Sequence, residues 1–164
     1  SDCASCSGTL KHIGSYFEDD PVWKDRAAVF SRKAMDLTEF LVNIGYRPRQ
    51  KVDVTFTYHD PCHLGRGCGV YDAPRNILRS IPGVELVEMA RNQRWSWCCG
   101  GGGGVPEAFP DLAQWNAEDR LREAEQTGAD LLLTTSALCL RSFAGCQNSR
   151  LQSQELLEFI YQAV

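Results

Sequence analysis

Two kinds of hydrophobic pattern alternate along the 164-residue chain. In one kind, apolar residues recur every three or four positions, which is typical of helices that bury one face. This pattern predicts helices at residues 21–44, 74–81, 109–127, 140–144 and 154–164. In the other kind, short runs rich in β-branched and apolar residues predict strands at residues 51–59, 84–89 and 129–135.

The order of these elements indicates the fold class. Strands that alternate with helices are typical of a parallel sheet with helices on both faces. We therefore expect an α/β fold with Rossmann-like layers: helices, sheet, helices. The longest predicted helix covers residues 21–44 without a break, since Asp20 can cap its start and Gly45 suits its end.

Each predicted strand leads toward a loop that contains cysteine. The three strands are followed in turn by Cys62, by Cys98 and Cys99, and by Cys139. Because parallel strands end at the same edge of a sheet, loops at their carboxyl ends lie close together. The sequence therefore predicts that cysteines far apart along the chain converge at one edge of the sheet.

The most unusual stretch is residues 95–105, which read WSWCCGGGGGV. Five glycines lose much backbone entropy on ordering, so a plain core has little use for them. They suit a site where two thiolates share one metal centre and backbone N–H groups approach the sulfurs. Trp95 and Trp97 either shield such a site from water or are ordinary core aromatics.

The eight cysteines favour metal ligation over disulfides. A chain of this length does not need a disulfide framework for stability, and paired thiols are typical of metal sites. A catalytic dithiol–disulfide enzyme is a further alternative. Ligating thiols indicate a reducing compartment, so we expect a cytoplasmic chain, associated with membranes only through its partners in a complex.

The net charge and the hydropathy of the chain argue against two classes of partner, nucleic acid and the interior of a membrane. A net charge of −4 and a pI near 5.4 argue against nucleic acid. No apolar run approaches the roughly 20 residues that a membrane helix needs, so no direct membrane span is expected.

The chain opens with a second cysteine motif, Cys3-x-x-Cys6. Residues 2–6 resemble residues 135–139, with Cys6 in the place of Cys139. This weak repeat suggests two copies of one module. We expect residues 1–20 to be the tail of a preceding module and residues 21–164 to form the second module.

Together these motifs resemble the cysteine-rich CCG domain family. Cys62 and Cys98 are separated by 35 residues, and Cys99 and Ser136 by 36. Further motifs are typical of the family branch named after heterodisulfide reductase: HDPCHLGR at 59–66, VYDAPR at 70–75, IPGVELVEM at 81–89 and WCCG at 97–100. The family, often with tandem domains, includes the B-type and D-type components of that reductase and the iron-sulfur components of glycolate, lactate and glycerol-3-phosphate oxidation.

The resemblance implies a function. It implies an iron-sulfur electron-transfer module of a heterodisulfide-reductase-like or 2-hydroxy-acid-oxidase-like complex, inactive as an isolated fragment. The implied ligands of a [4Fe-4S] cluster are Cys62, Cys98, Cys99 and Cys139. Cys3 and Cys6 match the closing cysteines of a preceding CCG module. The implied partners are that module and flavin- or quinone-linked subunits.

Ser136 stands where the five-cysteine version of the family has cysteine. A hydroxyl is a far weaker ligand than a thiolate, which leaves four cysteines. Four thiolates suit either a [4Fe-4S] cubane or a tetrahedral Zn²⁺ in a structural or docking domain. Cys68 and Cys146 lie off the pattern, and either could substitute for a ligand.

Other polar residues near the motifs have less defined roles. His63 is interpreted as a supporting donor or a solvated loop residue rather than a ligand, and Arg66 is one candidate to balance cluster charge. His12 and His59 are interpreted as structural.

Overall fold

The computed structural model describes residues 1–146 and 149–164. Its sheet is entirely parallel, in the order β2-β1-β3-β4. The strands are β1 (Val54–Tyr58), β2 (Val84–Leu86), β3 (Leu131–Thr134) and β4 (Gln152–Glu155). The predicted α/β class, with helices on both faces of a parallel sheet, is confirmed.

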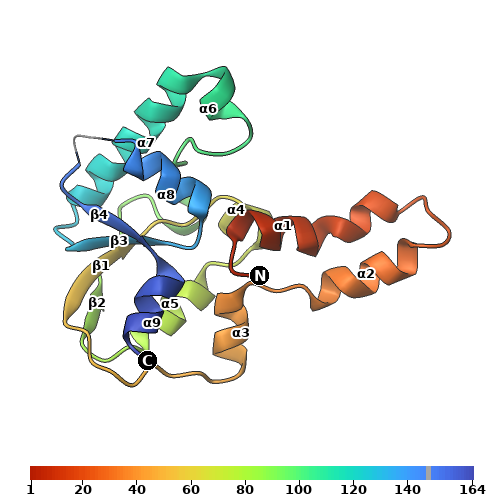
Figure 1. The fold of residues 1–164 in the computed structure, drawn as a ribbon, viewed down its shortest axis with the longest axis horizontal. Helices are drawn as coiled ribbons and strands as arrows, with labels where there is room; N and C mark the ends of the chain where they lie inside the picture. The colour runs from red at the N-terminus through yellow and green to blue at the C-terminus, as the bar shows by residue number, and fades with distance from the viewer. Residues whose placement is uncertain (147–148) are drawn as a thin grey trace.

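Helices cover both faces of this sheet (Figure 1). On one face lie α5 (Asp72–Arg79) and α9 (Leu156–Gln162), with α3 (Leu37–Asn43) packed against α5. On the other face lie α7 (Pro110–Glu125) and α8 (Ala137–Ala144).

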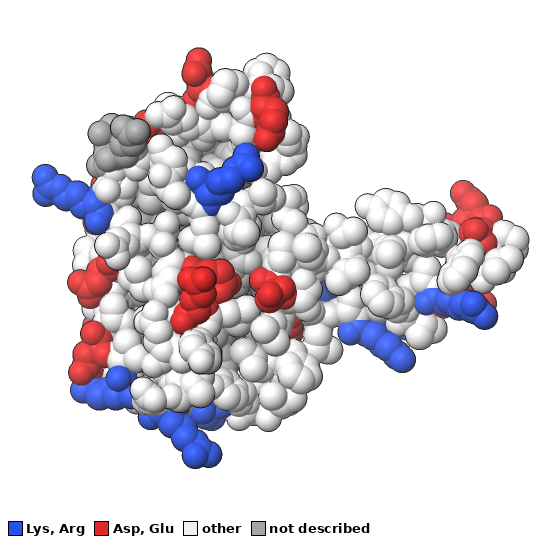
Figure 2. Space-filling view, viewed as in Figure 1, with Lys and Arg blue, Asp and Glu red and all other residues white. Residues whose placement is uncertain are grey.

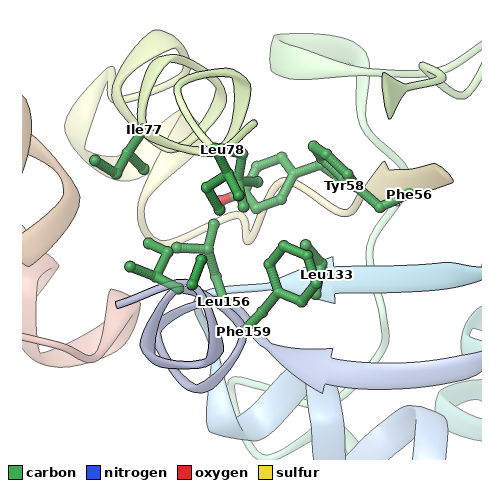
Figure 3. Close-up of a cluster of buried hydrophobic side chains, with 10 residues drawn as sticks. Phe56, Tyr58, Ile77, Leu78, Leu133, Leu156 and Phe159 are labelled. Atoms are coloured by element: carbon green, nitrogen blue, oxygen red, sulfur yellow. The ribbon is translucent and has the colours of Figure 1, made fainter. Parts of the chain in front are cut away.

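The core has one part on each face because successive strand residues point to opposite sides. Leu132 and Leu133 are both fully buried, but they belong to different clusters. Figure 3 shows the cluster on the α5 and α9 face, which includes Phe56, Tyr58, Ile77, Leu78, Leu133, Leu156 and Phe159. The opposite cluster packs α7 and α8 on the sheet and contains Cys99 and Cys139.

The strand order creates a switch point between β1 and β3. The connection from β1 to β2 passes through α5, whereas the connection from β2 to β3 passes through α7 on the opposite face. The loops that follow β1 and β3 therefore diverge, which is where open α/β sheets form their sites. Cys62 follows β1 and Cys139 follows β3.

The predicted helix over residues 21–44 is wrong, because the chain breaks it into α2 (Lys24–Lys33) and α3. The backbone is extended at Ala34, and Asp36 starts a new helix. The Asp36 carboxylate accepts the Thr38 N–H, and Glu39 accepts the Asp36 N–H, which forms a capping box. This cap satisfies helix-terminal N–H groups and stabilises the break.

The prediction for residues 154–164 is wrong in part. Residues 152–155 form β4, which pairs with β3, and α9 begins only at Leu156. The change of structure occurs at Glu155, whose carboxylate caps α9. The remaining predicted elements are present with shifted ends: β1, β2 and β3 are shorter than expected, and α5 and α8 begin two and three residues earlier.

The first residues form an arm that projects from the sheet (Figure 1). It consists of α1 (Ala4–His12), η1 (Ile13–Phe17) and α2. Tyr16 and Trp23 on this arm are largely exposed. The base of the arm is anchored, because the Ala4 N–H donates to the Thr135 carbonyl at 3.3 Å.

Short helices lie in the remaining loops: α4 (Gly65–Cys68), η2 (Gln93–Trp95) and α6 (Val105–Ala108). On the face drawn in Figure 2, lysine and arginine side chains are spread out and interspersed with acidic ones. Among residues 1–146 and 149–164, no helix combines the length and apolar character required to cross a membrane.

Candidate metal centre

Cysteines from three separate loops meet at the switch point. The Sγ atoms of Cys99 and Cys139 lie 3.1 Å apart, although 40 residues separate them. The thiols of Cys62 and Cys98 contact each other, and Cys98 also contacts Cys99. The four cysteines thus form a continuous chain of contacts, as the strand-to-loop pattern predicted.

The close packing of the sulfur atoms shifts the pKa values of neighbouring thiols in opposite directions. A hydrogen bond from Cys62 lowers the pKa of Cys98 to about 2, and the same bond raises the pKa of Cys62. Likewise, the bond between Cys99 and Cys139 lowers the pKa of Cys139 and raises that of Cys99. Each pair therefore favours one thiol and one thiolate, and the thiolate is the form in which cysteine binds metals.

The first two glycines after Cys99 bring the backbone to the sulfurs. The Gly100 N–H donates to Cys98 Sγ at 3.3 Å, and the Gly101 N–H donates to Cys99 Sγ at 3.4 Å. A Cβ at Gly100 would lie 2.5 Å from the carbonyl oxygen of Ala113 in α7. Glycine is required here because the loop is packed against a helix while its N–H groups face sulfur.

Ser136 is the N-cap of α8. Its hydroxyl oxygen accepts the Cys139 N–H at 3.4 Å, and its side chain is buried. Serine is a favoured N-cap residue because its oxygen satisfies a helix N–H that otherwise lacks a partner. The residue that departs from the family pattern therefore orients the turn that carries Cys139.

His59, interpreted from the sequence as structural, lies beside the clustered cysteines. A ring nitrogen of His59 lies within 4.8 Å of the Cys99 and Cys139 sulfurs, and all three side chains are buried. The ring also packs edge-on against Phe143 in α8, with 5.1 Å between ring centres. Its place at the end of β1, three residues before Cys62, was the only signal in the sequence.

Arg120 in α7 holds His59 in place. Its Nε donates to His59 Nδ1 at 3.0 Å, and its other nitrogens donate to the Glu123 carboxylate and the Ser96 hydroxyl. Arg120 is fully buried. The same guanidinium therefore fixes the imidazole and the segment that leads into Cys98.

The two cysteines of the opening motif lie apart from this chain of contacts. Cys3 precedes α1 and Cys6 is exposed within its first turn. Their thiols contact each other, and the hydrogen bond with Cys3 raises the pKa of Cys6. Their assignment to a preceding module stays a prediction.

The two cysteines off the pattern donate to backbone carbonyls. Cys68 Sγ donates to the His63 carbonyl at 3.2 Å, and Cys146 Sγ donates to the Ser142 carbonyl at 3.5 Å. Burial raises the pKa of both thiols. Both thiols are thus engaged with backbone oxygen atoms in the structure.

The remaining predicted site residues differ in their positions. His63 pairs with the Ser5 hydroxyl at 2.8 Å, which links the Cys62 loop to α1. Arg66 donates to the Ser96 carbonyl at 2.6 Å. The bond with Cys98 raises the pKa of Cys62, and the charge of Arg66 partly opposes this rise. Shielding by Trp95 is wrong, since 70% of this side chain is exposed. Trp97 is half-buried against Trp115.

The geometry agrees with the comparison against protein-family models. Residues 56–144 match the cysteine-rich domain family CCG, a segment that includes all four clustered cysteines. The chain belongs to this family. The CCG match begins in β1 and ends with α8, so it covers the switch point and the loops around it.

Curated relatives share most of the chain. It is 40% identical over 136 residues to the D-type component of dihydromethanophenazine:CoB–CoM heterodisulfide reductase from Methanosarcina barkeri, covering 80% of this chain and 33% of that relative. It is 33% identical to lactate utilization protein A of Shouchella clausii, covering 86% of this chain and 59% of that protein. A Methanococcus maripaludis protein, named an uncharacterized iron-sulfur protein, is 39% identical over 84% of this chain and 24% of its own length. The chain thus spans between about a quarter and three-fifths of these relatives.

Proposed function

We propose that Cys62, Cys98, Cys99 and Cys139 hold an iron-sulfur cluster and that the chain is an electron-transfer module of a larger oxidoreductase. The observation that carries this proposal is the contact chain of four cysteines drawn from three loops. Thiolates suit soft, electron-rich metal centres. The relatives include a component of heterodisulfide reductase and a protein named for iron-sulfur.

The residues present fit such a cluster. Two of the four sulfurs are buried, and two accept N–H bonds from Gly100 and Gly101, which offset negative charge. When bound, an iron-sulfur cluster supplies reversible one-electron transfer. The part of this chain is to ligate it, to limit the access of water, and to set its potential through hydrogen bonds to sulfur.

The number of thiolates supports a [4Fe-4S] cluster. Four cysteines are in contact, and the oxygen of Ser136 is engaged as a helix cap. Four thiolates would also suit a tetrahedral zinc ion, but the iron-sulfur names of relatives favour the cluster. Exposed Cys6 and half-buried Cys3 suit a second group completed by a preceding CCG module. We retain the proposed division into residues 1–20 and 21–164.

We base the proposed physiological reaction on sequence similarity to relatives. Identity is higher to the heterodisulfide reductase component than to the lactate utilization protein. We therefore favour a heterodisulfide-reductase-like complex over a 2-hydroxy-acid-oxidase-like one. In either case the expected electron partners are flavin- or quinone-linked subunits in the cytoplasm or at its membrane.

Anaerobic reconstitution tests the proposal. The chain is incubated with iron and sulfide, and bound iron, sulfide and zinc are measured per chain. Single serine substitutions at Cys62, Cys98, Cys99 and Cys139 are each expected to lower bound iron strongly. Serine at Cys68 or Cys146 is expected to leave iron at the wild-type level. Zinc without dithionite-reducible absorption would contradict the proposal, as would iron loss in the two control variants.

A further inference from the structure

The proton of the His59 ring has a defined position. Arginine carries only N–H donors, so the bond from Arg120 Nε requires His59 Nδ1 to be the acceptor. In the neutral ring, the proton then lies on Nε2. His59 Nε2 is buried and has no hydrogen-bond partner among the described residues.

A buried N–H without an acceptor destabilises the protein. The position of His59 Nε2 therefore indicates where an acceptor is expected. A buried donor without a partner has lost its hydrogen bond to water and gained none in the protein. The rest of the ring is well held: Arg120 fixes Nδ1, and Phe143 packs edge-on against one side. The same ring lies within 4.8 Å of the Cys99 and Cys139 sulfurs. The missing acceptor is therefore expected on the side of the metal centre.

We infer that His59 donates its Nε2–H to sulfur of the bound cluster and is not itself a ligand. This inference rests on the proposed function, because the acceptor is a sulfur of the cluster or of its ligating thiolates. A ligating Nε2 would have to lose the proton that the Arg120 bond places there. His59 therefore acts as a donor that raises the reduction potential, and Arg120 is the positioning residue that sets its tautomer.

Two substitutions at one position separate the donor from the rest of the ring. His59→Asn retains an oxygen that can accept from Arg120, but it cannot reach as far as Nε2. His59→Gln is longer and places an amide N–H near the Nε2 position. His12→Asn is the matched control, since His12 is exposed and bonds to the Gly67 carbonyl. Folding of each variant is checked by circular dichroism.

The variants are reconstituted anaerobically and titrated with dithionite under EPR detection. We expect His59→Asn to bind as much iron as the wild type but to have a more negative reduction potential. His59→Gln is expected to recover part of this shift, and His12→Asn to show none. In wild-type protein labelled with ¹⁵N-histidine, we expect a weak nitrogen coupling that disappears in His59→Asn.

The possible outcomes distinguish a failure of the His59 inference from a failure of the iron-sulfur proposal. Strong nitrogen coupling in the wild type, or loss of iron in folded His59→Asn, would show that His59 is a ligand. An unchanged potential in His59→Asn would show that it donates no bond to the centre. Either result overturns the inference while the cluster proposal stands. Failure of the wild type to bind iron would instead overturn the proposed function.

Discussion

Asp60 and Arg75 form a two-point ion pair at the start of the loop that carries Cys62. The guanidinium nitrogens donate to the two Asp60 oxygens at 2.6 and 2.9 Å, and both side chains are almost completely buried. Arg75 also donates to Glu88 at 2.6 and 3.0 Å. The pair fixes the loop two residues before Cys62 and links it to α5 and to the segment after β2.

Arg75→Met is expected to lower the free energy of unfolding by about 3–5 kcal/mol, because it leaves the buried Asp60 carboxylate without its cation. Chemical denaturation measures the change. Arg79→Met is the control, because Arg79 is 57% exposed and lies 3.9 Å from Glu88. It is expected to change stability by less than about 1 kcal/mol. Equal effects of the two substitutions would contradict this account.

Gly101→Ala tests the close packing of the glycine loop. The added Cβ would overlap with Ser142 Oγ and lie 2.7 Å from the Leu138 carbonyl oxygen. Overpacking of this kind costs about 1–3 kcal/mol, and it would also shift the N–H that approaches Cys99. We expect lower thermal stability and less bound iron after reconstitution.

Gly102→Ala is the matched control for this substitution. Among the described residues, its Cβ would meet only His63 Cε1, at an ordinary contact distance of 3.4 Å. Its stability and iron content should stay near the wild-type values. If Gly102→Ala loses as much stability and iron as Gly101→Ala, the length of the glycine run matters more than the packing at Gly101.

The convergence of the cysteines was predictable because it follows from topology. Parallel strands end at one edge, so loops after β1 and β3 meet wherever the intervening helices place the switch point. The break before α3 was also readable, since Asp36 and Glu39 have the spacing of a capping box. However, the helical spacing of apolar residues continues across residues 21–44, and this spacing predicted a single helix.

Other features depend on contacts that no local pattern contains. The strand β4 has the polar sequence QSQE, and it is extended because β3 offers it a partner edge. The role of His59 depends on Arg120, which lies 61 residues away in the chain. In both cases a residue's neighbours in space, rather than its neighbours in sequence, decide its state.

Glu155 gives a pH-dependent prediction. Burial raises the pKa of this carboxyl, while bonds from the Leu157 and Glu158 N–H groups partly oppose the shift. Because the folded state holds the proton more tightly than the unfolded state, stability falls as pH rises from the unfolded pKa to the folded one. Glu155→Gln retains an acceptor for α9 and does not titrate.

Glu155→Gln should therefore gain stability relative to the wild type as pH rises above roughly 4, the ordinary range of a glutamate pKa. Urea denaturation across this range measures the difference. Glu158→Gln, at an exposed site in the helix that Glu155 caps, controls for the loss of one negative charge. A difference between Glu155→Gln and the wild type that is constant with pH would show that the buried carboxyl does not carry the effect.

Ser136→Ala separates a cap from a ligand. The hydroxyl oxygen accepts the Cys139 N–H at the start of α8, so its removal is expected to cost about 0.5–2 kcal/mol of unfolding free energy. Bound iron should stay at the wild-type level, because the proposed cluster uses four thiolates and no oxygen. Ser136→Asn, which supplies another good cap, should restore the stability. Loss of iron in Ser136→Ala with stability intact would instead make the serine oxygen a ligand, and the centre would not be an all-cysteine cluster.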